Sequence, residues 1–103
     1  MDKDSIYVTV NHIYDFAGGN PFRCGDELFL KKEPDNLYDD EAIAVYDRHG
    51  VKCGMIANSV STVARGTMSA GRVFDRTEDG QKAVVRFILE DCMIAQFQTI
   101  VQP

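Results

Sequence analysis

The sequence has few cysteines, and none of them lie close together. The three cysteines, Cys24, Cys53 and Cys92, are far apart, and no C-x-x-C pair occurs. An odd number of widely separated cysteines argues against a disulfide framework. Zinc sites usually contain closely spaced ligand pairs, and the two histidines, His12 and His49, add none. We therefore expect reduced, mostly buried thiols and no metal site.

Long hydrophobic runs are absent as well. The chain has 103 residues, of which 45% are hydrophobic and 26% are charged, as in ordinary soluble globular proteins. No apolar run approaches the length that a membrane-spanning helix needs. The first four residues, MDKD, lack the apolar core of a signal peptide. The sequence thus predicts a soluble, cytoplasmic protein with no membrane partner, in which residues 1–103 form a single domain.

Positive charge is in short supply. The chain has 11 Lys and Arg against 16 Asp and Glu, which gives a formal net charge of −5 at pH 7. Broad binding to duplex nucleic acid usually depends on basic patches that release counterions, so this balance argues against it. The sequence leaves open whether the remaining basic residues gather on one face. The candidates are Arg23, Lys31, Lys32, Arg65, Arg72, Arg76, Lys82 and Arg86.

Catalytic motifs are missing. No Ser-His-Asp or Cys-His spacing, phosphate-binding glycine loop or dinucleotide fingerprint occurs. The acidic residues Asp35, Asp39, Asp40 and Glu41 invite comparison with nucleases in which several carboxylates hold two metal ions. Because consecutive acidic residues on a turn rarely converge, we expect neither catalysis nor a cofactor. The chain is predicted to be a binding protein and not an enzyme.

The residues that are present favour a mostly β protein. Short apolar or alternating segments bounded by turn-forming residues predict strands. These segments are 6–14, 27–33, 42–46, 51–56, 72–76 and 82–90. Turns at 49–50 and 78–80 join the last four of them into two hairpins, and 93–101 is either a strand or irregular. Such a series of short strands suits a small, partly open barrel.

One segment predicts a helix. Asn58 or Ser59 is a suitable N-cap, and Gly71 follows the last expected helical residue, Ala70, where a glycine C-cap belongs. Val60, Val63, Ala64 and Met68 would then share one apolar face. The glycine-containing segment 15–25, in contrast, is expected to have no regular structure.

The segment from Glu33 to Gly54 combines a rigid turn, a cluster of acidic and aromatic residues and a hairpin. Pro34 restricts its own φ and pushes Glu33 toward extended geometry, so a strand that ends there must turn sharply. Asn36 and Asp39 favour such turns because their side chains bond to nearby backbone. We expect the functional site in this segment, because the scaffold holds side chains in fixed directions.

The same segment resembles the core signature of the HIRAN domain family, in which an acidic-Pro-x-Asn-x-Tyr-Asp-x-x-Ala-Ile-x-Val stretch precedes a glycine. The matching residues are Glu33, Pro34, Asn36, Tyr38, Asp39, Ala42, Ile43, Val45 and Gly54. The pair Gly25-Asp26 before the preceding strand also fits the family, and the resemblance is strong over 6–57. It implies a mostly β fold: a small OB-like, partly open β-barrel of about six strands with one or two short helices.

The resemblance also implies a function. HIRAN domains of helicase-like remodelling enzymes capture the 3′-hydroxyl end of single-stranded DNA, with the Tyr-Asp pair of the motif near the terminal nucleotide. Tyr38 and Asp39 are therefore expected to take that role in DNA repair or replication-fork processing. A tyrosine ring stacks on bases, and a carboxylate repels phosphate but accepts a hydrogen bond from a free hydroxyl. In the alternative interpretation, Tyr38 packs on the barrel and Asp39 only caps the turn.

Other positions complete the expected site. His12, Ile13 and Tyr14 stand where end-binding family members have a basic residue and two aromatic residues. Only Tyr14 matches fully, and a place in the barrel core or rim would explain it equally well. Met55 and Asn58 replace residues that contact phosphate in relatives, so we expect weaker binding than in those relatives.

Neighbouring cations are candidates to replace these contacts. Lys52 is the first candidate, followed by Arg65 and by Lys31 or Lys32, although charged strand residues are usually just solvated. Asn36 is the candidate for which locking the turn is the favoured role. The predicted nucleic-acid-binding residues are His12, Tyr14, Asn36, Tyr38, Asp39 and Lys52.

The expected ligand is the 3′ end of single-stranded DNA, or RNA, and the expected protein partner is a helicase or nuclease. A protein-interaction module is the competing hypothesis, because the acidic surface would suit a basic partner or a second copy of the chain. A carboxylate nuclease is a third. The sequence leaves the oligomeric state open.

Overall fold

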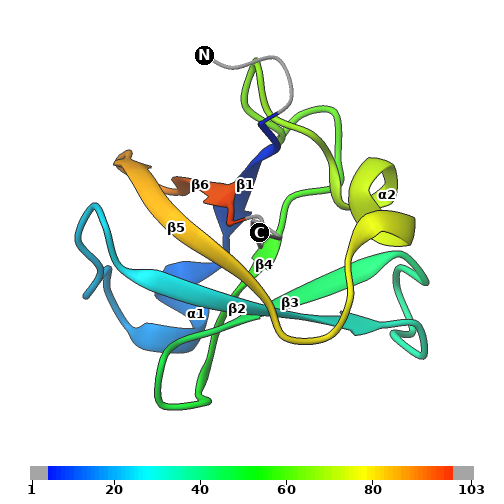
Figure 1. Cartoon of the computed structure of the whole chain (residues 1–103), viewed down its shortest axis with the longest axis horizontal. Helices are drawn as coiled ribbons and strands as arrows, with labels where there is room; N and C mark the ends of the chain where they lie inside the picture. The colour runs from blue at the N-terminus through cyan, green and yellow to red at the C-terminus, as the bar shows by residue number, and fades with distance from the viewer. Residues whose placement is uncertain (1–4, 99–103) are drawn as a thin grey trace, which may run out of the picture.

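The structure is a computed structural model that describes residues 5–98. Within them, antiparallel strands close into a single barrel in the order β1-β4-β3-β2-β5-β6, and short helices lie outside it (Figure 1). The strands are β1 (Tyr7–Asn11), β2 (Glu27–Glu33), β3 (Ala42–Tyr46), β4 (Lys52–Ile56), β5 (Gln81–Ile88) and β6 (Met93–Phe97). The helices are α1 (Ile13–Ala17), α2 (Ala70–Val73) and the 3₁₀ helix η1 (Phe74–Arg76).

The barrel interior is filled by alternate residues of each strand. On β2, Leu28 and Leu30 are almost completely buried, and on β3, Ile43 and Val45 are fully buried. Leu30 lies opposite Val45 in the β2–β3 ladder, so the two side chains share the inner face. Burying each such side chain contributes roughly 1.5–3 kcal/mol, which makes this interior the anchor of the fold.

The structure confirms a mostly β fold with a small barrel. The barrel is closed and not partly open, because β1 pairs with both β4 and β6. The strands expected at 27–33 and 42–46 have the predicted bounds. Residues 93–97 form a strand, and 99–101 lie outside the described residues.

The prediction for the segment after β1 is wrong. The first strand ends at Asn11, and α1 follows, although 15–25 was expected to be irregular and Tyr14 to lie on a strand. His12 has a φ of 63° and turns the chain into this helix, and Gly18, with a φ of 73°, ends it. Burial of Ile13 holds the short helix against the barrel.

The prediction of a helix over 58–70 is also wrong. Residues 57–69 form a loop beside β1, which pairs with β4 only through Val10 and Asn11. Backbone groups earlier in β1 are therefore available to the loop. The Met68 amide donates to the Tyr7 carbonyl at 2.7 Å. Tertiary hydrogen bonds thus replace the helical ones that local pattern favours.

Side chains hold this loop in place as well. The buried Thr9 hydroxyl accepts a hydrogen bond from the Ala64 amide at 3.1 Å and lies 2.8 Å from the Thr67 hydroxyl oxygen. Gly66 has a φ of 89°, which a right-handed helix does not contain. Val60, expected on a buried helix face, is 99% exposed.

The strand predicted over 72–76 is replaced by α2 and η1. Ser69 caps α2 by accepting a hydrogen bond from the Arg72 amide, and the helix buries Ala70 and Val73, three residues apart on one face. The turn at 78–80 therefore joins η1 to β5 and closes no hairpin.

Two further predictions concern cysteines and membranes. The three cysteines are free; Cys53 is buried, Cys92 is half-buried and Cys24 is exposed, so the last does not fit the expectation of buried thiols. In the described part of the chain, no helix has the length and apolar character needed to cross a membrane.

Candidate functional site

The connection between β2 and β3, residues 34–41, is called the site loop here, and Asn36 organises it. The Asn36 side-chain oxygen accepts hydrogen bonds from the Tyr38 amide at 2.9 Å and the Asp39 amide at 3.2 Å. Its side-chain nitrogen donates to Glu33 Oε1 at 3.2 Å. Asn36 therefore has the turn-locking position expected from the sequence, and its polar atoms face the protein.

Tyr38 extends from this loop into solvent. It is 96% exposed, and its neighbour Leu37 is 93% exposed. The ring therefore does not pack on the barrel, which is the opposite of what the alternative interpretation proposed. An exposed ring next to a rigid turn has both faces available for stacking, and the two Asn36 hydrogen bonds fix the backbone from which it extends.

Asp39 is half-buried, and both of its carboxylate oxygens have partners. Oδ1 accepts a hydrogen bond from the Glu41 amide at 2.9 Å, and Oδ2 accepts one from Asn58 Nδ2 at 2.8 Å. Asp39 thus caps the turn, as the alternative interpretation expected. Each carboxylate oxygen has two lone pairs, so one more donor can still approach each of them.

Lys52, the cation expected to serve the site, is joined to the end of β2. Its ammonium group donates a hydrogen bond to Glu33 Oε2 at 2.9 Å and lies 5.1 Å from the centroid of the Phe16 ring. The hydrogen bond from Lys52 is the main cause that lowers the pKa of Glu33 below its ordinary value. Most of this positive charge is therefore matched inside the protein.

His12 is the N-cap residue before α1, and Tyr14 lies on α1. The Nδ1 atom of His12 is 2.8 Å from Asp15 Oδ2, and the half-exposed Tyr14 donates through its hydroxyl to the Glu90 carbonyl at 3.1 Å. Figure 1 shows α1 and the site loop near opposite ends of β2. The structure therefore groups Asn36 and Tyr38 with Asp39, and connects Lys52 to them through Glu33. His12 and Tyr14 are not in direct contact with this group, although Lys52 also lies over Phe16 of α1.

Three consecutive carboxylates of the site loop converge, contrary to expectation. Asp39, Asp40 and Glu41 place one oxygen each within 4.8 Å of one another. Such oxygens are suitable ligands for a hard cation such as Mg²⁺. Asp40 and Glu41 are exposed, however, and Asp39 already accepts two hydrogen bonds. Exposed acidic clusters of this kind occur without a metal, so the cluster by itself assigns no metal site.

Two partners of the site were missed from the sequence. Asn58 was expected to cap a helix, yet its side chain donates to Asp39 and accepts a hydrogen bond from the Gly71 amide at 2.7 Å. Glu33 holds both Asn36 and Lys52. Only the contact between Glu33 and Asn36 is local enough for a turn pattern to indicate it.

Comparison with known proteins identifies a family and a shared fold. A scan against protein-family models matches residues 4–91 to the HIRAN domain. No curated protein matches the chain. A solved structure, the crystal structure of the HIRAN domain of human HLTF, matches with a TM-score of 0.58 and 19% sequence identity, covering 90% of this chain and 74% of that one. At this identity the structural match shows a shared fold.

Proposed function

The chain belongs to the HIRAN domain family, and from this premise we propose that it binds the 3′-hydroxyl end of single-stranded DNA through Tyr38 and Asp39. Family membership supports nucleic-acid binding in general. The end preference depends on the chemistry of the two adjacent side chains. Asn36 supports the proposal indirectly, because it fixes the loop that carries both of them.

The observation that carries the proposal is the 96% exposed Tyr38 ring next to a half-buried carboxylate. Stacking of a base on an aromatic ring contributes about 1–3 kcal/mol and tolerates any base. A terminal hydroxyl can donate a hydrogen bond to Asp39, whereas a terminal phosphate would bring negative charge against the carboxylate. Together these effects favour a free 3′ end over a phosphorylated one.

The finer points of the proposal concern partners and context. We propose that the domain binds and does not itself catalyse a reaction, and that it marks strand ends for a helicase or nuclease. Roles in DNA repair or replication-fork processing, binding of RNA and a cytoplasmic location remain predictions. So do contacts of His12, Tyr14 and Lys52 with ligand, and the extent of the single domain over 1–103.

Fluorescence anisotropy with matched single-stranded oligonucleotides tests the proposal. One strand ends in a 3′-hydroxyl and the other in a 3′-phosphate, and each is titrated at several salt concentrations. We expect tighter binding of the hydroxyl end by roughly tenfold, the equivalent of about 1.4 kcal/mol. Equal affinity for both ends would contradict end recognition.

The competing proposal, a protein-interaction surface, is favoured by the exposed apolar side chain of Leu37 beside Tyr38 in an acidic loop. A basic partner, or a second copy of the chain, would suit the net charge of −5. The same titration separates the two proposals, since the interaction surface predicts no binding of either oligonucleotide. Sedimentation analysis at rising concentration would then reveal self-association.

A further inference from the structure

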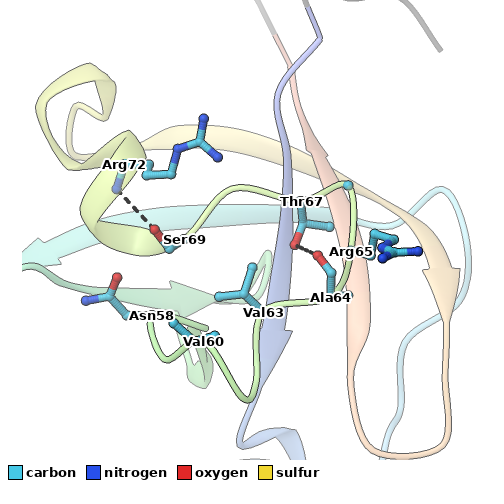
Figure 2. A pocket seen from close by; sticks show the side chains of 9 residues that line it. Asn58, Val60, Val63, Ala64, Arg65, Thr67, Ser69 and Arg72 are labelled. Carbon is cyan, nitrogen blue, oxygen red and sulfur yellow. Dashed lines mark hydrogen bonds between the residues drawn. The ribbon is translucent and has the colours of Figure 1, made fainter.

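A second feature lies next to the site loop, on the far side of Asn58. Residues of the loop 57–69 and of α2 line a cavity of about 350 Å³ (Figure 2). Its lining includes two arginines, Arg65 and Arg72, and two valines, Val60 and Val63. The cavity depends on the loop conformation of 57–69. If these residues formed the expected helix, their side chains would not surround this space. We call it the arginine pocket.

The two arginines give this pocket a charge opposite to that of the whole chain. Within residues 5–98, no carboxylate lies within 4.0 Å of either guanidinium group, although the net charge is −5. Both side chains are exposed. Lys52 and Lys82, in contrast, are each paired with a glutamate. Neither arginine is thus ion-paired within the described residues, although Asp39 and Glu41 of the site loop lie beside Asn58 and Gly71.

The two guanidinium groups do not converge on one point. Figure 2 shows Arg72 on α2 and Arg65 at the far end of the loop, with their guanidinium groups well apart. Such an arrangement does not suit a single small anion held from both sides. It suits a ligand that carries several negative charges in a row, as the backbone of a nucleic acid does.

The pocket is physically connected to the proposed end-binding residues. Asn58 lines the pocket and donates its 2.8 Å hydrogen bond to Asp39. A Cβ atom built on Gly71 of α2 would lie 2.8 Å from Glu41 Oε1, so α2 also touches the site loop directly. A strand whose terminal nucleotide lies at Tyr38 would therefore have its next phosphates close to α2 and the loop.

We infer that the arginine pocket binds the phosphate backbone of the strand whose 3′ end occupies the site loop, with Arg72 and Arg65 contacting successive stretches of it. The inference rests on the proposed binding of single strands. In this chain, Arg65 and Arg72 would then contact phosphate in place of the residues that Met55 and Asn58 replace. The nearly fully exposed Val60, which also lines the pocket, offers apolar contact to a sugar or base.

Charge-removing variants test the inference. Arg65→Gln, Arg72→Gln and the double variant are compared with the unmodified chain by anisotropy, using a 3′-hydroxyl oligothymidylate of about ten nucleotides and a thymidine dinucleotide. Each single variant should weaken binding of the long strand roughly 3- to 10-fold, and each lost phosphate contact should lower the salt slope by about 0.7. Binding of the dinucleotide, which reaches only the site loop, should be unchanged.

The matched control is Arg86→Gln on β5, where the guanidinium group donates to Gln96 Oε1 at 2.9 Å. It removes the same charge elsewhere on the barrel. An equal loss of affinity in this control would show a general charge effect and overturn the inference. So would unchanged long-strand binding in the double variant, or a parallel loss of dinucleotide binding.

The proposed function and this inference fail in different ways. If 3′-phosphate and 3′-hydroxyl strands bind equally well, yet the double variant still loses affinity and salt dependence, end recognition is wrong and the arginine pocket stands. If the end preference is present and the double variant behaves like the unmodified chain, the pocket is wrong and the end site stands. Melting temperatures of all variants check that each one folds.

Discussion

Asn58 and Asp39, which are 19 residues apart in the chain, share a 2.8 Å hydrogen bond between Nδ2 and Oδ2. The Asn58 oxygen meanwhile accepts a hydrogen bond from the Gly71 amide at 2.7 Å. A single amide group therefore connects the site loop, the end of β4 and the start of α2. Asn58 uses both the nitrogen and the oxygen of its side-chain amide. Neither an acidic nor an aliphatic residue at this position can therefore make both hydrogen bonds.

Substitution of Asn58 should destabilise the fold. Asn58→Ala leaves the Gly71 amide without its acceptor and removes a donor from Asp39, which should cost about 1–3 kcal/mol. Urea unfolding followed by fluorescence or circular dichroism measures the change. Ser61→Ala, in the same loop but exposed, is the control and should shift the midpoint little. A midpoint shift no larger than that of the control would contradict the role of Asn58.

Asn58→Asp tests the direction of the bond. It keeps an oxygen for the Gly71 amide but places a second carboxylate against Asp39, so the two negative charges repel each other. The stability of the variant should be lowest relative to the unmodified chain at about pH 7. The difference should shrink as acid protonates one carboxylate of the pair. Stability that is equal to that of the unmodified chain at neutral pH would show that the donor is not required.

Tyr38 should matter for binding and hardly at all for folding. Because its side chain is 96% exposed, Tyr38→Ala should change the free energy of unfolding by less than about 0.5 kcal/mol. The same variant should weaken single-strand binding by about 1–3 kcal/mol, the value of one stacked base. Tyr38→Phe keeps the ring and is the matched control. A fall in melting temperature for Tyr38→Ala would indicate a structural role, and equal affinities of the two variants would exclude stacking.

The strands could be predicted because their signals are local. Leu28 and Leu30 alternate with Phe29 and Lys31, and Ile43 and Val45 lie in a short apolar run between turns, so the sequence predicts both strands with their bounds. The turn at Asn36 was predictable for the same reason, since its hydrogen bonds span no more than three residues.

The parts that were missed depend on contacts that are distant in sequence. Residues 58–70 carry helical spacing, but Thr9 and the backbone of β1 offer them tertiary partners, and Gly66 with its positive φ interrupts the helical pattern. Asn58 could be recognised as a cap but not as a partner of Asp39, because nothing near it in sequence indicates the site loop. The arginine pocket is lined by residues of the same loop, so it could not be predicted from the sequence either.

The pair of Glu33 and Lys52 should make stability depend on acid pH. Lys52 lowers the pKa of Glu33 from its ordinary value of 4.5. A carboxyl group with a lowered folded pKa stabilises the fold above its unfolded pKa, and this stabilisation is lost as the pH falls through the folded value. Melting temperatures measured from neutral pH down through this range should therefore fall less steeply for Glu33→Gln than for the unmodified chain.

Two controls separate the pair from general acid denaturation. Lys52→Gln removes the main cause of the lowered pKa of Glu33 and should flatten the pH profile in the same range. Glu78→Gln removes an exposed carboxyl on the turn before β5 and should leave the profile unchanged. If the profiles of Glu33→Gln and Glu78→Gln coincide, the ion pair contributes nothing measurable.

Gly54, the glycine of the family signature, should not tolerate even a methyl group. A Cβ atom at this position would lie 2.9 Å from the Asn11 carbonyl oxygen and 2.9 Å from Val10 Cγ1. Both belong to β1, which is fixed by its pairing with β4 and β6, so neither can move away cheaply. Gly54→Ala should cost about 1–3 kcal/mol.

Gly71→Ala is the matched comparison. Its Cβ would come even closer, 2.8 Å, to Glu41 Oε1, but that atom is the free end of an exposed side chain and can rotate away. The Cβ would also lie 3.2 Å from Asn58 Oδ1, which has to shift by a few tenths of an ångström. Alanine also favours a helix over glycine by about 1 kcal/mol, so this variant should be nearly neutral. Thermal unfolding should show Gly54→Ala lower in melting temperature by about 4–8 °C for each kcal/mol lost. Equal melting temperatures for the two variants would mean that β1 can shift to admit a side chain, and that Gly54 is not required for the packing of β1 against β4.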